Sequence, residues 1–97
     1  MVNQGDIIKV EGIKYNLLVV SKDVMNELDY CIVVPFSKGF KENAVHISTS
    51  FSSKELLLTE QVRYVDLNSR FYKTIGRVSL DEMVNIIDII QGLFDFY

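Results

Sequence analysis

The sequence predicts a mainly β protein with a C-terminal helix, folded as a small, partly open barrel or curled antiparallel sheet. Three observations support this fold class. Short apolar runs separated by turn residues recur through residues 6–78, residues 17–20 are apolar without interruption, and residues 79–94 show apolar positions at helical spacing. The chain of 97 residues has room for one core, so residues 1–97 are expected to form a single domain.

Alternating patterns and turn residues divide the first part of the chain into five or six short strands. The second strand is expected in the centre of the sheet, because residues 17–20 are apolar on both faces. A tight turn at Glu11 and Gly12 joins it to the first strand, and residues 22–29 and 48–53 are interpreted as loops. The expected strands cover residues 6–11, 15–21, 30–36, 44–48, 56–66 and 74–78.

A helix is predicted to begin at Ser79. Ser79 and Glu82 have the spacing of a capping box, in which a hydroxyl and a carboxylate satisfy otherwise unpaired backbone donors. One apolar stripe is expected to pack on the sheet, formed by Met83, Ile86, Ile87, Ile90 and Phe94.

Composition sets limits on location and partners. The longest apolar runs, residues 17–20 and 32–36, are far shorter than the ~20 residues that cross a bilayer. The N-terminus shows no basic region followed by an apolar block, so the chain is expected to be soluble, cytoplasmic and without a membrane partner. The single cysteine, Cys31, lies in an apolar run and is interpreted as a core residue.

The charge is unevenly distributed. The net charge of −3 argues weakly against a nucleic-acid binder. Residues 37–77, however, hold seven basic side chains against four acidic ones, whereas residues 78–97 hold no lysine or arginine. The body of the protein is therefore expected to present a mildly basic face.

The polar segment that follows the leucines of residues 56–58 is the strongest candidate for a functional site. If the strand continues, its period of two buries Val62 and places Gln61 and Arg63 together on the other face. An arginine held on a sheet beside an amide is a rigid fork of donors, suited to a phosphate or a carboxylate. The alternative is a solvated face on which Arg63 pairs with Glu60 or Asp66.

The residue inventory limits the chemistry. One histidine, one cysteine and no carboxylate cluster predict no metal site, and the absence of a glycine-rich phosphate loop predicts no cofactor. RNA cleavage fits, because the substrate supplies the attacking 2′-hydroxyl. Arg63 would stabilise the phosphate charge, and Asp66 or His46 would move protons. In a regular strand Arg63 and Asp66 face opposite ways, so they converge only if the strand ends near Val65.

Further candidates each have a structural alternative. Ser37, followed by Lys38, ends an apolar strand, which suits either a phosphate contact or simple termination of the strand. Tyr15, beside Lys14 near the tight turn, is placed either to stack on a base or to pack within the strand. His46 is expected to point outward from its strand, and its structural alternative is an ordinary surface residue or a satisfied core residue.

Taken in order, these segments resemble the MazF/PemK (Kid) family of toxin endoribonucleases from toxin–antitoxin pairs. The most specific part is residues 56–66, similar to the family pattern of leucine, glutamate, glutamine, any residue, arginine, two of any residue, and aspartate. The resemblance covers residues 5–93. Its other segments are residues 5–7, 17–23, 33–37 and 75–79, followed by the amphipathic helix.

The resemblance implies an SH3-like barrel of the MazF/PemK/CcdB type, a homodimer, and an mRNA interferase that cleaves single-stranded RNA at short sequences without a metal, restrained by a cognate antitoxin protein. It implies that Arg63 is the phosphate-stabilising or acid group, that Asp66 is a base or a structural partner, and that Gln61 and Ser37 contact the substrate. His46 matches no catalytic position of the family.

The chain departs from the family pattern in its first loop. Family members carry a long loop ending in an arginine-proline pair, whereas Tyr15 and Asn16 occupy these positions here. Lys14 is a neighbour without the planar fork of an arginine. Two alternatives stay open: a catalytically weak member that binds antitoxin or RNA, and a gyrase-poisoning toxin of the same fold. The gyrase reading would use the tail residues Phe94, Phe96 and Tyr97.

Overall fold

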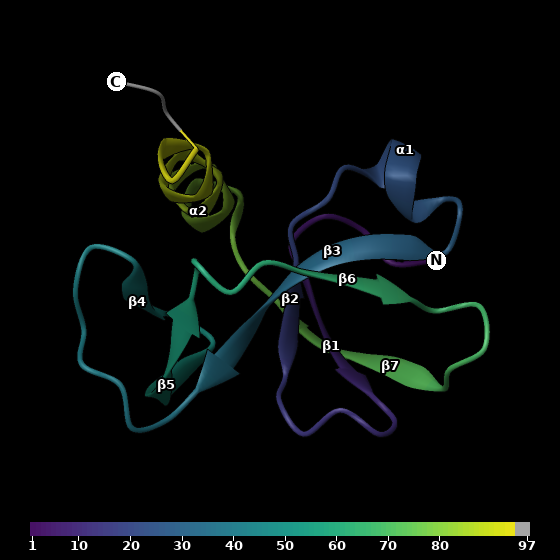
Figure 1. Ribbon diagram of the computed structural model, residues 1–97, viewed down its shortest axis with the longest axis horizontal. Helices are drawn as coiled ribbons and strands as arrows, with labels where there is room; N and C mark the ends of the chain where they lie inside the picture. Colours follow the sequence, from purple (N-terminus) through teal and green to yellow (C-terminus); the bar gives the residue numbers. More distant parts are fainter. Residues whose placement is uncertain (95–97) are drawn as a thin grey trace.

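The computed structural model describes residues 1–94 and is mainly β with a C-terminal helix, as predicted (Figure 1). Residues 95–97, which include Phe96 and Tyr97 of the predicted tail, lie outside the described residues. The strands are β1 (Asp6–Val10), β2 (Leu17–Val19), β3 (Tyr30–Ser37), β4 (His46–Thr49), β5 (Ser52–Leu58), β6 (Arg63–Asp66) and β7 (Tyr72–Arg77). The helices are α1 (Asp23–Asn26) and α2 (Leu80–Gly92).

Strand β3 organises the sheet. The strands pair in the order β4-β5-β3-β2-β1-β7, all antiparallel, and β6 also pairs with β3. The first half of β3, residues 30–33, pairs with β6, residues 33–35 pair with β2, and residues 36–37 pair with β5. In Figure 1, β3 accordingly runs from α1 and β6 across the molecule to β5. The β5–β6 connection therefore lies beside the middle of β3, between Val33 and Phe36.

The uninterrupted apolar run of β2 is buried on both faces, as predicted. Leu18 belongs to a core cluster with Ile7 and Val34, whereas Leu17 belongs to a second cluster that contains Cys31. Consecutive strand residues point to opposite faces, so a strand between two cores needs apolar residues at every position. Cys31 is fully buried, and burial raises the pKa of its thiol to about 11. Its interpretation as a core residue is confirmed.

Helix α2 covers the first cluster. Ser79 and Glu82 form the predicted capping box. Met83, Ile86 and Ile90 are buried against the sheet, and Ile87 is partly buried. Phe94 is 73% exposed, so its prediction as part of the stripe was wrong. The helix ends at Gly92, and residues beyond the end no longer follow the helical period that aligned them in the sequence. Within residues 1–94, no helix has the length and apolarity needed to cross a membrane.

Several predicted boundaries were wrong. Residues 22–29 contain the short helix α1, because buried Asn26 bonds to Ser21 through its side-chain amide. The second strand is confined to Leu17–Val19, so the first connection spans residues 11–16 rather than a tight turn. Strands β4 and β5 form a hairpin where residues 48–53 were expected to be a loop.

The contact between Ser50 and Glu82 ties the β4–β5 hairpin to the start of α2, and it predicts a pH effect. The Ser50 hydroxyl donates to Glu82 at 2.6 Å, and this bond holds the pKa of the Glu82 carboxyl below its ordinary value. A lowered folded-state pKa stabilises the fold above the unfolded-state pKa of about 4.3, and the stabilisation is lost as the pH falls through the folded-state value. Ser50→Ala is expected to reduce stability modestly at neutral pH, and much less in acid.

Urea denaturation of wild type and Ser50→Ala across this pH range checks the expectation. Ser53→Ala is a matched control, because Ser53 is also an exposed serine of the same hairpin. A difference between wild type and Ser50→Ala that stays constant with pH would contradict the assignment.

Candidate functional site

The predicted strand of residues 56–66 is interrupted by a turn. Buried Thr59 ends β5 because its backbone N–H and its hydroxyl both donate to the Val45 carbonyl, at 3.1 and 2.6 Å. Val62 is therefore 38% exposed, and the prediction that it is buried was wrong. The prediction that Gln61 and Arg63 lie together is confirmed, since Arg63 Nη2 donates to Gln61 Oε1 at 3.4 Å.

Arg63 is not neutralised by its neighbours in the sequence. The Glu60 carboxylate contacts His46 Nε2 at 2.6 Å, and Asp66 accepts hydrogen bonds from Asn68. Among residues 1–94, no carboxylate lies within ion-pair distance of Arg63. The alternative of an Arg63 paired with Glu60 or Asp66 is contradicted. The guanidinium keeps most of its donors for a bound anion.

Three adjoining surface hollows bring the predicted site residues together. The middle hollow, of about 130 Å³, contains Gln61 and Arg63. It shares Tyr15 and Ser37 with a hollow of about 510 Å³, and it shares Arg63 with one of about 380 Å³. We call this surface the Arg63 groove. The predicted site residues all line it: Lys14, Tyr15, Ser37, Lys38, Gln61, Arg63 and Asp66.

Asp66 lines the same hollow as Arg63, and its hydrogen bonds are with the turn that follows β6. Strand β6 ends at Asp66, next to Val65, so convergence of the two side chains on one phosphate stays a prediction. The Asp66 Oδ1 atom accepts hydrogen bonds from the backbone N–H and the side-chain amide of Asn68, at 2.8 and 3.0 Å. These bonds form an Asx turn that directs the chain toward Arg70, which lines the same hollow as Arg63.

The connection between β1 and β2 supplies one wall of the groove. Tyr15 is partly buried and lies outside β2, so the prediction that it starts the second strand was wrong. Its ring lies 5.7 Å from Lys14 Nζ, within the range of a cation–π contact. The groove thus has a tyrosine and a lysine opposite the arginine of β6.

His46 lies beside the groove and not on the outer surface. Its side chain is 14% exposed, although it lies on the face of β4 opposite Ile47, which packs against the first core cluster. Besides Glu60, the ring contacts the Asn43 amide through Nδ1 at 3.4 Å and packs edge-on against Phe40, with ring centroids 5.2 Å apart. The histidine therefore joins β4 to the turn that carries Gln61 and to Phe40, which forms part of the wall of the groove.

Loss of the His46 contacts is expected to loosen this wall. His46→Ala removes a hydrogen bond to a partly exposed carboxylate and an aromatic contact, together worth about 1 kcal/mol of unfolding free energy. Urea denaturation measures this loss. Ser53→Ala, at an exposed position on the paired strand β5, is the matched control and is expected to change stability by less than about 0.5 kcal/mol. Equal stability of His46→Ala and wild type would show that the contacts of His46 with Glu60 and Phe40 contribute nothing to the free energy of unfolding.

Sequence reasoning did not single out several residues of the groove, among them Phe40, Glu55 and Arg70. Phe40 lines two of the hollows and is 45% exposed, Glu55 lines the largest, and Arg70 lines the hollow with Asp66. The signal for Phe40 is a large aromatic residue in a polar loop directly after Gly39. Within residues 1–94, no three His, Cys, Asp or Glu side chains gather closely enough to hold a metal ion.

Comparison with known proteins identifies the family. Residues 4–94 match the family model described as PemK-like, MazF-like toxin of type II toxin-antitoxin system. The chain belongs to this family. The match includes β1 through α2, and therefore the whole Arg63 groove. No curated protein matches the chain at a significant level.

Solved structures show the same fold for this PemK/MazF-like chain. A MazE-MazF structure from Deinococcus radiodurans has a TM-score of 0.82 and 14% identity, covering 95% of this chain and 94% of that one. An endoribonuclease in complex with its cognate antitoxin, from a mycobacterial species, has a TM-score of 0.78 and 12% identity over 100% of both chains. A mycobacterial endoribonuclease has a TM-score of 0.79 and 12% identity, over 94% and 88%.

Proposed function

We propose that this PemK/MazF-like toxin is a cytoplasmic, metal-independent endoribonuclease that cleaves single-stranded RNA, mRNA included, at short sequences. The main support is Arg63, which lies on a strand in a surface groove without a carboxylate partner among residues 1–94. An arginine so placed is prepared for a phosphodiester rather than for a structural ion pair. Family membership supports the same reaction.

The proposed reaction is attack by a ribose 2′-hydroxyl on the adjacent phosphorus. The 2′-hydroxyl releases its proton to water as its oxygen forms a new P–O bond. The bond to the 5′-oxygen breaks, and that oxygen takes up a proton from water, so the products are a 2′,3′-cyclic phosphate and a 5′-hydroxyl. Negative charge grows on the phosphoryl oxygens in the transition state, and the Arg63 guanidinium stabilises it. Gln61 orients Arg63 through the contact between their side chains.

The remaining groove residues are proposed to bind and position the RNA. Ser37 and Lys38 donate to phosphate oxygens at the end of β3, and Lys14 adds a positive charge across the groove. Tyr15 presents an aromatic ring on which a base can stack. Asp66 is proposed as a structural partner, because its carboxylate shapes the turn at Asn68.

We also propose a cognate antitoxin and a homodimer. The MazE-MazF structure and the mycobacterial complex support the antitoxin, since each of those toxins is seen with one. Leu80 and Val84 of α2, 79% and 58% exposed, are apolar residues available for contacts between chains. Light scattering on the purified protein is expected to give twice the chain mass.

Incubation of purified protein with mixed-sequence single-stranded RNA in excess chelator tests the proposed activity. Cleavage at a limited set of sites is expected, with 5′-hydroxyl and cyclic phosphate ends. Intact RNA after prolonged incubation would overturn the nuclease proposal. Binding without cleavage would favour a catalytically weak binding module. One observation supports that second candidate: Tyr15 stands where other members carry an arginine, so the groove has one arginine fewer.

A further inference from the structure

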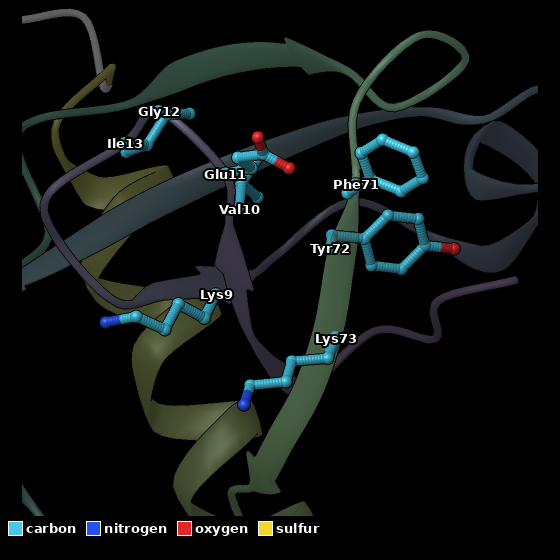
Figure 2. A pocket seen from close by; sticks show the side chains of 8 residues that line it. All are labelled: Lys9, Val10, Glu11, Gly12, Ile13, Phe71, Tyr72 and Lys73. Carbon is cyan, nitrogen blue, oxygen red and sulfur yellow. The ribbon is translucent and has the colours of Figure 1, made fainter.

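A fourth surface hollow extends the Arg63 groove beyond Asp66. It has a volume of about 400 Å³ and lies between the end of β1 and the start of β7, where Lys9, Phe71 and Lys73 line it (Figure 2). It shares Ile13 with the hollow that contains Arg63 and Arg70. The surface is therefore continuous from the end of β3, past Arg63, to the edge strand β7.

The two lysines of this hollow are an unfavourable pair in the isolated chain. Lys9 and Lys73 are direct partners across the antiparallel β1–β7 ladder. Like charges in such positions repel each other and destabilise the sheet. Among residues 1–94, neither lysine has a carboxylate within ion-pair distance. Figure 2 shows both side chains extending from their strands to the same side, with Glu11 apart from them. A bound anion would relieve this repulsion.

Phe71 presents an aromatic ring to solvent at the same hollow. Its side chain is 81% exposed, although its backbone is held by the hydrogen bond from the Glu11 N–H to the Phe71 carbonyl at 2.8 Å. An exposed ring on an ordered backbone that lines the same hollow as two lysines can serve as a stacking platform for a base of single-stranded nucleic acid, with the lysines available to the neighbouring phosphates. An acidic peptide would use the lysines, but it would use the ring only if it also carried a suitably placed apolar side chain.

Charge along the extended surface favours a polyanion. In a chain with a net charge of −3, the four hollows together are lined by six basic and three acidic residues. The basic residues are Lys9, Lys14, Lys38, Arg63, Arg70 and Lys73, and the acidic ones are Glu11, Glu55 and Asp66.

We propose that the hollow of Lys9, Phe71 and Lys73 is a second RNA-binding subsite, which holds the strand on one side of the phosphate at Arg63. The lysine pair binds a backbone phosphate, and a base stacks on Phe71. The inference rests on the proposed function for the identity of the ligand. Its additional content is that an RNA long enough to reach the second hollow binds more tightly, and is cleaved faster, than an RNA that fills the Arg63 groove alone.

The test compares short and long RNA. Fluorescence anisotropy would measure binding of labelled, mixed-sequence 2′-O-methyl RNA pools of about 5 and about 15 nucleotides, lengths within the range that small β-barrel domains bind. Phe71→Ala, or Lys9→Gln combined with Lys73→Gln, is expected to weaken binding of the long pool about tenfold, as loss of one stacked base or of phosphate contacts would. Binding of the short pool is expected to change less than twofold. Lys22→Gln, an exposed lysine outside the four hollows, is the matched control.

The possible results test the proposed subsite independently of the proposed nuclease activity. If the wild type binds the long pool more tightly and the variants lose that gain, the subsite is supported, whether or not unmodified RNA is cut. If the variants bind both pools as the wild type does, or if the wild type binds neither pool, the subsite is overturned. Capture of an acidic peptide at this hollow with unchanged RNA affinity in the variants would also overturn it. Absence of cleavage by the wild type counts against the nuclease alone.

Discussion

Arg63→Ala is expected to lower the rate of RNA cleavage by about 100-fold or more, the usual cost of removing one preorganised donor from a developing oxyanion. The loss should appear mainly in kcat, because the guanidinium acts most strongly on the charge that grows in the transition state. The fold should be unaffected, since the Arg63 side chain is exposed and forms one long hydrogen bond, to Gln61.

Two further variants sharpen the Arg63 experiment. Arg63→Lys keeps the charge and loses the planar fork, so it is expected to recover only part of the rate. Lys22→Ala removes an exposed cation outside the groove and is expected to cleave as the wild type does. Rates would be measured under single-turnover conditions, with circular dichroism to check folding. Unchanged cleavage by Arg63→Ala would remove Arg63 from the mechanism.

Phe36→Ala is expected to destabilise the fold by about 3 to 5 kcal/mol, the range for truncating a buried phenylalanine. Phe36 is fully buried in β3. Its backbone N–H donates to the Asn16 carbonyl at 2.9 Å, and it is paired with Leu57 of β5. Its ring packs against Phe51, with centroids 5.1 Å apart, in the cluster that α2 covers. Loss of this side chain would leave a cavity between the sheet and the helix.

Urea and thermal denaturation would measure the effect of Phe36→Ala. Because small domains are stable by only about 5 to 15 kcal/mol, the variant is expected to be close to unfolding at physiological temperature. Phe36→Leu keeps most of the volume and is expected to cost about 1 kcal/mol. Phe71→Ala is the matched control, since this phenylalanine is 81% exposed, and it is expected to change stability by less than about 0.5 kcal/mol. A small loss of stability in Phe36→Ala would mean that neighbouring side chains fill the cavity and would contradict this prediction.

The groove combines features that were visible in the sequence with features that were not. Gln61 and Arg63 were predicted to lie together, and they do, although the intervening Val62 is exposed. Their separation of two residues made the prediction correct even though Thr59 interrupts the strand. The roles proposed for Ser37, Lys38 and Lys14 remain predictions, and the structure places all three on one surface.

By itself, the sequence determined the parts of this protein that depend on local pattern. An uninterrupted apolar run predicted the two-sided burial of β2, and the helical period of the apolar residues predicted the buried face of α2. The spacing of Ser79 and Glu82 predicted the start of that helix. These features were readable because the residues that define each one are within a few positions of each other along the chain.

Only the tertiary structure decided whether the Arg63 guanidinium is available to bind an anion. That depends on Glu60, which His46 engages from 14 residues away, and on Thr59, whose bonds to Val45 end β5 and turn the chain. Local sequence allowed Arg63 to pair with Glu60 or Asp66 equally well. The choice among these partners is made by hydrogen bonds between segments that meet only after the sheet has formed, so no local pattern records it.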